Sequence, residues 1–221
     1  MRLGVMISGR GSNLQALIRA CGGRFYPAEV ALVVSNRAEA AGLVHAAAAG
    51  IASAVVAARD RTRFAAEADA LLRRHRVDLV CLAGFMRLLD HGFVEAWRDR
   101  MVNIHPSLLP AFPGLHAQRQ ALAAGVRFAG CTVHFVRPET DTGPIIGQAV
   151  VPVHSGDDET SLSARILAAE HRLYPGAVRL IAEGRAKVVG DRVEIDGWQA
   201  PALVALNPPE PPADPLVSKR G

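Results

Sequence analysis

Short apolar runs alternate with helical patterns along the first half of the chain, and this alternation constrains the fold more than any other feature. Apolar runs of strand length occupy Leu3 to Ser8, Glu29 to Ser35 and Val77 to Ala83. Segments with apolar residues at helical spacing separate these runs. Because a continuously apolar run is typical of a strand buried on both faces, the pattern predicts a three-layer α/β fold. Its core would be a mostly parallel, Rossmann-like sheet flanked by helices.

The other elements expected in this half have small-residue or amphipathic patterns. They are a helix beginning near Ser12 or Asn13, a helix over Ala38 to Ala49, a strand over Ala52 to Val56, a helix over Arg59 to His75, a helix over Asp90 to Arg98 and a strand over Arg100 to Ile104. In open α/β sheets, ligands bind beyond the carboxyl ends of the strands. We therefore expect the Gly9 turn, the Gly84 loop and the Asn103 stretch to meet at one edge.

The second half predicts an antiparallel extension of this sheet. Residues Arg127 to Arg137 alternate in character, and a second run covers Ile145 to Val153, with a long loop between them. Long loops in compact domains are often functional. The pattern predicts two antiparallel strands joined by a loop that carries Asp141.

Helices and a small hairpin complete the expected fold. We expect a helix over Ala117 to Ala124, a long helix over Asp158 to Glu183 that Pro175 should kink or split, and a hairpin over Lys187 to Ile195. Residues 1–197 are assigned to one domain. Residues 198–221 are rich in proline and are expected to form a flexible tail.

Charge and cysteine content exclude several function classes. The net charge is +4 and the chain has no block of Lys and Arg with interleaved aromatics, so nucleic-acid binding is not expected. A mildly cationic surface suits a small anionic substrate. Cys21, Cys81 and Cys131 lie among apolar residues, which favours core packing without a disulfide framework or a metal site. No signal peptide or apolar run of membrane length is seen, so we expect no membrane partner and a cytoplasmic location.

A glycine-containing turn follows the first apolar run, with the sequence Gly9-Arg10-Gly11-Ser12-Asn13. It begins like a dinucleotide fingerprint, but Leu14 takes the place of the third glycine, and the second strand ends in Ser-Asn-Arg and not in an acid placed to hold a ribose. A nicotinamide cofactor is therefore not expected. Two interpretations stay open from these residues alone: a site for a single phosphate at a helix N-terminus, or a tight turn without a ligand.

The stretch Asn103-Ile104-His105-Pro106 carries the chemistry that the sequence suggests. Residues i and i+2 of a strand point the same way, so Asn103 and His105 should face one site. An amide donor beside a titratable ring is suited to stabilising an oxyanion at an acyl carbon. Taken alone, the pattern is more typical of a buried histidine and a turn asparagine at a strand end, and the rest of the chain reverses that preference.

Several motifs in order along the chain resemble the folate-dependent formyltransferase superfamily. They are Ile-Ser-Gly-x-Gly-Ser-Asn-Leu-Gln, Leu-Ala-Gly-Phe-Met-Arg, Asn-Ile-His-Pro-Ser-Leu-Leu-Pro-x-Phe-x-Gly, Gly-Cys-Thr-Val-His, Asp-x-Gly-Pro-Ile-Ile and Glu-His-x-x-Tyr-Pro. The resemblance runs from about residue 2 to about residue 195. It implies the formyltransferase fold and transfer of the formyl group of 10-formyltetrahydrofolate to the amine of 5'-phosphoribosylglycinamide, in purine synthesis, without a metal.

The resemblance also implies roles for individual residues. Asn103 and His105 would stabilise the oxyanion, and Asp141 would favour the charged imidazole. The ribonucleotide phosphate and ribose would contact Gly11, Ser12, Asn13 and Glu170. The folate would contact Arg63, Met86, Arg87, Leu88, Leu89 and Asn103. A cis Leu109–Pro110 bond is expected on the same grounds, and His134 is given no role.

Other members of the superfamily supply the alternatives. One formylates methionyl-tRNA and needs an added C-terminal RNA-binding domain, for which the proline-rich tail is too short. Another hydrolyses formyltetrahydrofolate and carries an N-terminal regulatory domain, whereas here the formyltransferase pattern starts at Arg2. A phosphate-ligand binder without catalytic activity is a further alternative. Monomer and homodimer both remain open.

Overall fold

The computed structural model describes residues 1–197, and the predicted tail, 198–221, lies outside the described residues. Seven strands form one sheet in the order β3-β2-β1-β4-β5-β6-β7. The strands are β1 (Arg2–Ile7), β2 (Glu29–Ser35), β3 (Ser53–Val55), β4 (Leu79–Leu82), β5 (Met101–His105), β6 (Phe128–Phe135) and β7 (Ile145–Pro152). The first five pair in parallel, and β6 and β7 are antiparallel. This arrangement confirms the predicted mostly parallel sheet with an antiparallel extension.

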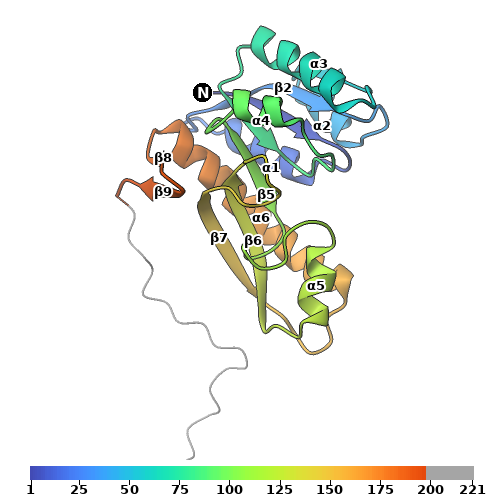
Figure 1. Cartoon of the computed structure of the whole chain (residues 1–221), viewed down its shortest axis with the longest axis vertical. Coiled ribbons are helices and arrows are strands. Elements are labelled where there is room, and N and C mark those ends of the chain that lie inside the picture. Colours follow the sequence, from blue (N-terminus) through green and yellow to red (C-terminus); the bar gives the residue numbers. More distant parts are fainter. Residues whose placement is uncertain (198–221) are drawn as a thin grey trace, which may run out of the picture.

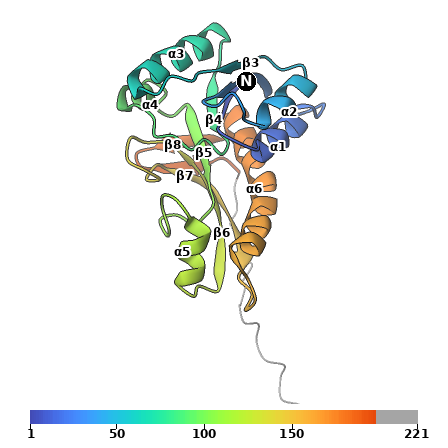
Figure 2. The ribbon, with the colours of Figure 1, turned by 90° about the vertical axis from the view of Figure 1, so that its right-hand side faces the viewer.

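Helices cover both faces of the sheet (Figures 1 and 2). On one face lie α1 (Ser12–Cys21), α2 (Gly42–Ala48) and α6 (Glu159–Ala182), and on the other lie α3 (Arg61–Arg74) and α4 (His91–Ala96). The short helix α5 (Ala117–Ala123) is tied to the start of α6 by an ion pair between Arg119 and Glu159. Two further strands, β8 (Ala186–Val189) and β9 (Arg192–Ile195), form a separate hairpin.

Two hydrophobic clusters, one on each face, hold these layers together. Leu14 and Leu17 of α1 and Val178 of α6 belong to one cluster, and Phe64 of α3 and Trp97 after α4 belong to the other. All four residues of β4 are buried, as a strand covered on both faces requires. The continuous apolar runs of the sequence therefore correspond to the centre of the sheet.

Two predicted helices differ from those observed, one in where it begins and the other in being unbroken. The second helix begins at Gly42 instead of Ala38, and the Gly42 amide donates a hydrogen bond to the Gly9 carbonyl. The expected break at Pro175 is wrong in part, because α6 is one unsplit helix through that residue. Proline removes one backbone hydrogen bond, but burial of Tyr174 and Val178 on either side compensates for that loss.

The Tyr174 hydroxyl connects α6 to two central strands, at the last residue of β4 and the second residue of β5. Its oxygen lies 3.0 Å from the Leu82 carbonyl of β4 and 3.2 Å from the Val102 carbonyl of β5, and the side chain is fully buried. A buried hydroxyl needs a partner, and either carbonyl accepts from it. This contact fixes α6 against the pair β4 and β5, beside the end of β4.

Candidate functional site

The loops that follow β1, β4 and β5 meet at one edge of the sheet, as the sequence predicts. The Ser8 amide donates to the Gly84 carbonyl at 3.3 Å, and the Met86 amide donates to the Ser8 hydroxyl at 2.8 Å. In the next pair of strands, Leu82 lies opposite Asn103. The glycine turn, the Gly84 loop and the Asn103 stretch are therefore neighbours.

Asn103, His105 and Asp141, called the transfer cluster below, come together although Asp141 arrives from a different loop. His105 Nδ1 lies 3.4 Å from Asp141 Oδ2, and the two side chains are only 7% and 10% exposed. Asn103 lies at the same place, beside His134, whose Nε2 is 3.2 Å from Asn103 Nδ2 and 3.8 Å from Asp141 Oδ1. Asn103 and His105 thus face one site.

Backbone geometry holds the Asp141 carboxylate in place. Asp141 has a φ of 57°, which is unusual for a residue with a side chain, and its Oδ2 accepts a hydrogen bond of 2.7 Å from the Gly114 amide. Gly143 packs so closely on the end of β6 that a Cβ there would meet the Phe135 carbonyl oxygen at 1.7 Å. The loop after β6 is therefore anchored at both the carboxylate and the glycine.

The His105 ring has an acceptor at each nitrogen. Nδ1 faces Asp141, and Nε2 lies 3.0 Å from the carbonyl oxygen of Phe112. A neutral imidazole carries one N–H and an imidazolium carries two. The doubly protonated ring is therefore the form that satisfies both neighbours, and it is also the form that donates to a developing oxyanion.

His134, to which the sequence analysis gave no role, is part of this arrangement. It pairs with Asn103 across β5 and β6, and its side chain is buried. Burial lowers the pKa of His134, so the ring is neutral at neutral pH. Its Nδ1 is 3.0 Å from the Phe135 carbonyl, which assigns the proton to Nδ1. Nε2 then accepts from the Asn103 amide and fixes that side chain. This role could not be predicted from the sequence, because the contact depends on the register of the two antiparallel strands.

A second buried side chain of β6 fixes the turn after His105. The Thr132 hydroxyl donates to the Ser107 carbonyl at 2.7 Å and accepts from the Leu109 amide at 3.1 Å. Gln148 of β7 donates to the Leu109 carbonyl at 2.8 Å. The Leu109–Pro110 bond is cis, as the resemblance implies. These contacts hold the segment that presents the Phe112 carbonyl to His105.

The predicted phosphate loop lies at the N-terminus of α1. The helix begins at Ser12, as the sequence predicts, and its N-cap is Gly11, with a φ of 75° and no capping side chain. A Cβ at Gly11 would meet the Gly42 Cα at 2.5 Å, which explains why the turn needs glycine there. The first amides of α1 are left for another acceptor, as in anion sites at helix N-termini.

Asn13 and Glu170 meet beside this turn. Asn13 Nδ2 donates to Glu170 Oε2 at 2.7 Å, and both side chains are buried. Burial raises the pKa of Glu170 to about 7, against which the Asn13 hydrogen bond acts only in part. Asn13 Oδ1 is buried without a partner among the described residues. An unpaired acceptor next to a carboxyl group of raised pKa is suited to a ligand that has hydroxyl groups.

The predicted folate loop presents apolar side chains to solvent. Met86 and Leu88 are 74% and 61% exposed, whereas Leu89 is half-buried. Arg87 turns away: its guanidinium donates to the Ala58 and Arg59 carbonyls and lies 4.7 Å from the centre of the Phe64 ring. Met86 and Leu88 therefore give this loop a small apolar surface that is open to a ligand.

Arg63, the remaining residue predicted to contact folate, lies in the first turn of α3. Its side chain is 76% exposed, and its guanidinium donates to Glu67 at 2.8 Å. This is a surface ion pair between residues four positions apart on a helix. The structure gives Arg63 no contact with the Gly84 loop, and its folate role stays a prediction.

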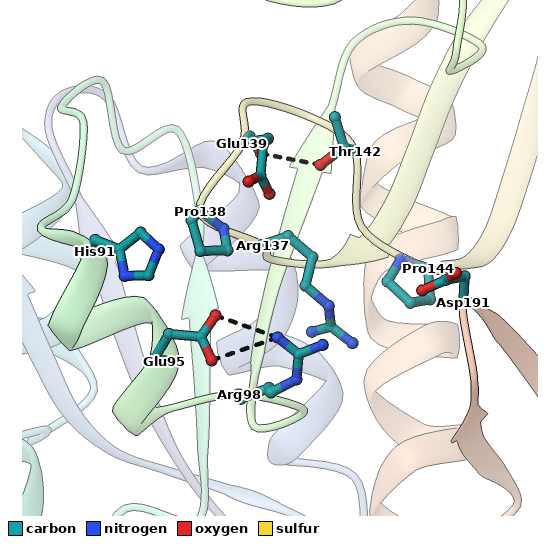
Figure 3. Close-up of a pocket in the computed structure, with 9 residues that line it drawn as sticks. All are labelled: His91, Glu95, Arg98, Arg137, Pro138, Glu139, Thr142, Pro144 and Asp191. Atoms are coloured by element: carbon teal, nitrogen blue, oxygen red, sulfur yellow. Dashed lines mark hydrogen bonds and ion pairs between the residues drawn. The ribbon is translucent and has the colours of Figure 1, made fainter.

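Two cavities flank the loops. One, of about 610 Å³, lies at the ends of β2 and β3 and includes Arg37, Arg59 and Arg87. The other, of about 320 Å³, is polar and lies between α4, the 137–144 segment and the β8–β9 turn (Figure 3). It is lined by Glu139 and Thr142, on either side of Asp141, but by none of the predicted site residues.

A metal-binding cluster and a membrane-spanning helix are both absent from the described residues. Within residues 1–197, no group of three or more His, Cys, Asp or Glu side chains is placed to hold a metal ion. No helix in the described part of the chain has both the length and the apolar character needed to cross a bilayer.

Comparisons with known proteins agree with this geometry. The family model described as Formyl transferase matches residues 1–178. Phosphoribosylglycinamide formyltransferase of Escherichia coli K12 is 44% identical over 204 residues, which cover 91% of this chain and 96% of that protein. A crystal structure of glycinamide ribonucleotide transformylase 1 from Symbiobacterium toebii superposes with a TM-score of 0.86 at 54% identity, over 88% of this chain and 93% of that one.

Similar sequences also occur inside much longer proteins. The trifunctional purine biosynthetic protein adenosine-3 of Drosophila pseudoobscura is 51% identical over 195 residues. The match covers 86% of this chain but only 14% of the insect protein. The likeness to that protein therefore concerns one part of it.

Proposed function

The chain belongs to the formyl transferase family, and on this premise we propose that it transfers the formyl group of 10-formyltetrahydrofolate to the amine of 5'-phosphoribosylglycinamide. The products are the N-formyl ribonucleotide and tetrahydrofolate, on the route to IMP. The observation that carries the proposal is the buried pair His105–Asp141, beside Asn103, at the same sheet edge as the uncapped N-terminus of α1.

The chemistry follows from the donors of the transfer cluster. The substrate amine attacks the formyl carbon, and the carbonyl oxygen takes up negative charge as the tetrahedral intermediate forms. His105 donates its Nε2–H to that oxygen in place of the Phe112 carbonyl, while Nδ1 stays against Asp141. The site is largely shielded from water, where such a donor is most effective. The bond between the formyl carbon and N10 of the folate then breaks, N10 gains a proton and the amine loses one. The His105–Asp141 pair is placed to carry that proton.

Asn103 is the second donor. Its side-chain nitrogen has two N–H groups, and His134 accepts one of them. The other remains for the oxyanion. Because neutral His134 fixes the rotation of the amide, the free N–H is oriented before the substrate arrives.

The two substrates bind to the loops next to the transfer cluster. The phosphate binds to the amides of Gly11, Ser12 and Asn13, where the helix dipole favours negative charge. The ribose hydroxyl groups reach Asn13 Oδ1 and Glu170. The pterin of the folate covers Met86 and Leu88, with Arg87 and Leu89 shaping the loop. The reaction moves an acyl group and a proton, so it needs neither a nicotinamide cofactor nor a metal.

An ultraviolet assay of folate turnover tests the proposal. Purified protein is mixed with 10-formyltetrahydrofolate, with and without the ribonucleotide, and the N-formyl product is measured by mass. We expect turnover only with the ribonucleotide. Equal turnover without it would instead indicate a hydrolase, and binding of the ribonucleotide without turnover would indicate a binder. A His105→Ala preparation controls for contaminating enzymes. Cytoplasmic location and oligomeric state stay predictions, to be checked by fractionation and by light scattering.

A further inference from the structure

Arg10 lies between the two glycines of the turn that precedes α1. The turn on which it sits is held firmly: the Gly42 amide donates to the Gly9 carbonyl at 3.0 Å, and Gly11 packs on the Gly42 Cα. The backbone of Arg10 is therefore fixed next to the first amides of α1. Only its side chain is free to move, and that side chain is exposed.

The Arg10 guanidinium has no partner within residues 1–197. Other surface arginines, such as Arg2, Arg37 and Arg73, form ion pairs with nearby carboxylates. Arg10 forms neither an ion pair nor a side-chain hydrogen bond in this part of the chain, and the first turn of α1 contains no acidic residue. An unpaired cation beside uncapped helix amides leaves a positive spot at the edge of the site.

A second, independent feature at the same helix end points to a ligand. Asn13 is more than nine-tenths buried, and its Oδ1 has no hydrogen-bond partner in the described part of the chain. A buried acceptor that the protein leaves unsatisfied is normally satisfied by something bound. This helix end therefore offers amide donors, an arginine cation and a buried acceptor within one turn.

We propose that Arg10 is a specificity-determining residue, whose guanidinium closes over the phosphate of the ribonucleotide and makes the site selective for a phosphorylated substrate. The inference rests on the proposed function. The planar guanidinium donates to two phosphate oxygens at once, while the α1 amides bind the others from the opposite side. The flexible side chain is the part that opens for entry, since the backbone of the turn is clamped.

Arg10→Gln and Arg10→Lys separate charge from shape. For Arg10→Gln we expect the KM for the ribonucleotide to rise about 10- to 100-fold, the range for loss of hydrogen bonds to a charged group. Both kcat and the KM for the folate should stay near wild type. Arg10→Lys keeps the positive charge but loses the planar guanidinium. Its KM for the ribonucleotide should lie between those of wild type and Arg10→Gln. Arg24→Gln removes an equally exposed cation near the other end of α1 and serves as the control.

Binding of inorganic phosphate, followed by ³¹P line broadening, tests the site without relying on catalysis. Phosphate should bind more weakly to Arg10→Gln than to wild type or Arg24→Gln, and salt should weaken binding to wild type more than to Arg10→Gln. An unchanged ribonucleotide KM together with unchanged phosphate binding in a folded Arg10→Gln protein overturns the inference. Weakened phosphate binding in a protein that transfers no formyl group would keep the role of Arg10 and reject the proposed function.

Discussion

Around His105 the polar side chains contact one another and the backbone. At the glycine turn and the Gly84 loop, in contrast, the protein presents backbone amides and side chains that have few partners. The transfer cluster is buried, and Asp141 is tied to both His105 and Gly114. Across the same edge, Gly11 carries no capping side chain and Met86 is largely exposed. The first region has its hydrogen-bond partners within the protein, and the second leaves its donors and apolar side chains open to the proposed substrates.

This difference separates two kinds of substitution. A change in the first region removes a donor needed at the reacting carbon, so it should appear mainly in kcat. A change in the second region removes binding that the ground state and the transition state share, so it should appear mainly in KM.

The strongest test of the first region is His105→Ala. Loss of one oxyanion donor costs about 10²–10³ in kcat. Because no substrate-binding loop is altered, both KM values should stay within a few-fold of wild type. Steady-state kinetics measure this directly, and His154→Ala, at an exposed histidine, serves as the control. A large rise in the ribonucleotide KM with unchanged kcat would move His105 into the binding region.

Asp141→Asn sharpens the assignment inside the transfer cluster. The substitution keeps the shape but removes the negative charge that faces His105 Nδ1. We expect a loss in kcat of about tenfold or more, and a double variant with His105→Ala that is hardly worse than His105→Ala alone, because residues that act as a unit are not additive. Multiplicative losses would give Asp141 an independent role.

Gly11→Val tests the second region. A β-branched residue at a φ of 75° is strained, and its Cβ would meet the Gly42 Cα at 2.5 Å. We expect a loss of about 1–3 kcal/mol in the free energy of unfolding and a ribonucleotide KM raised about tenfold or more, with the folate KM little changed. Gly156→Val, at an unobstructed glycine, is the matched control for both measurements. A selective rise in the folate KM would contradict the assignment of the turn.

A further test concerns the pH dependence of stability through Glu170. Its pKa is raised from 4.5 to about 7 by burial, so the native state holds a proton that the unfolded state loses first. Stability should therefore fall as the pH rises from about 4.5 to 7 and stay level above that, by about 3 kcal/mol in total.

Glu170→Gln keeps the acceptor for Asn13 but cannot ionise, so it should remove this pH-dependent loss. Urea unfolding from pH 4.5 to 8 gives the gap between variant and wild type in the free energy of unfolding. Glu194→Gln, at an exposed carboxylate, is the control. A constant gap across that range would mean that Glu170 does not titrate there. Because Glu170 is proposed to contact the ribose, Glu170→Gln should also raise the KM for the ribonucleotide.

The sequence predicts the parts of this site that depend on local pattern. Alternation of apolar runs and helical segments gives the sheet and its carboxyl edge, and the spacing of Asn103 and His105 gives their common face. Strand register is not local, so the His134 contact with Asn103 is not visible in the sequence. The direction of the Arg87 side chain and the unbroken α6 depend on packing between distant segments, which overrides local preference.

The contacts of α6 also bear on the order in which the site can assemble. Tyr174 bonds to carbonyls 92 and 72 residues earlier in the chain, and Glu170 bonds to an asparagine 157 residues earlier. A chain emerging from a ribosome as far as Thr142 already contains every residue of the transfer cluster. It still lacks the helix that clamps β4 to β5 and closes the site beside α1. Completion of the site therefore waits until α6 has been made, so a helix late in the domain sets the spacing of the parts made before it.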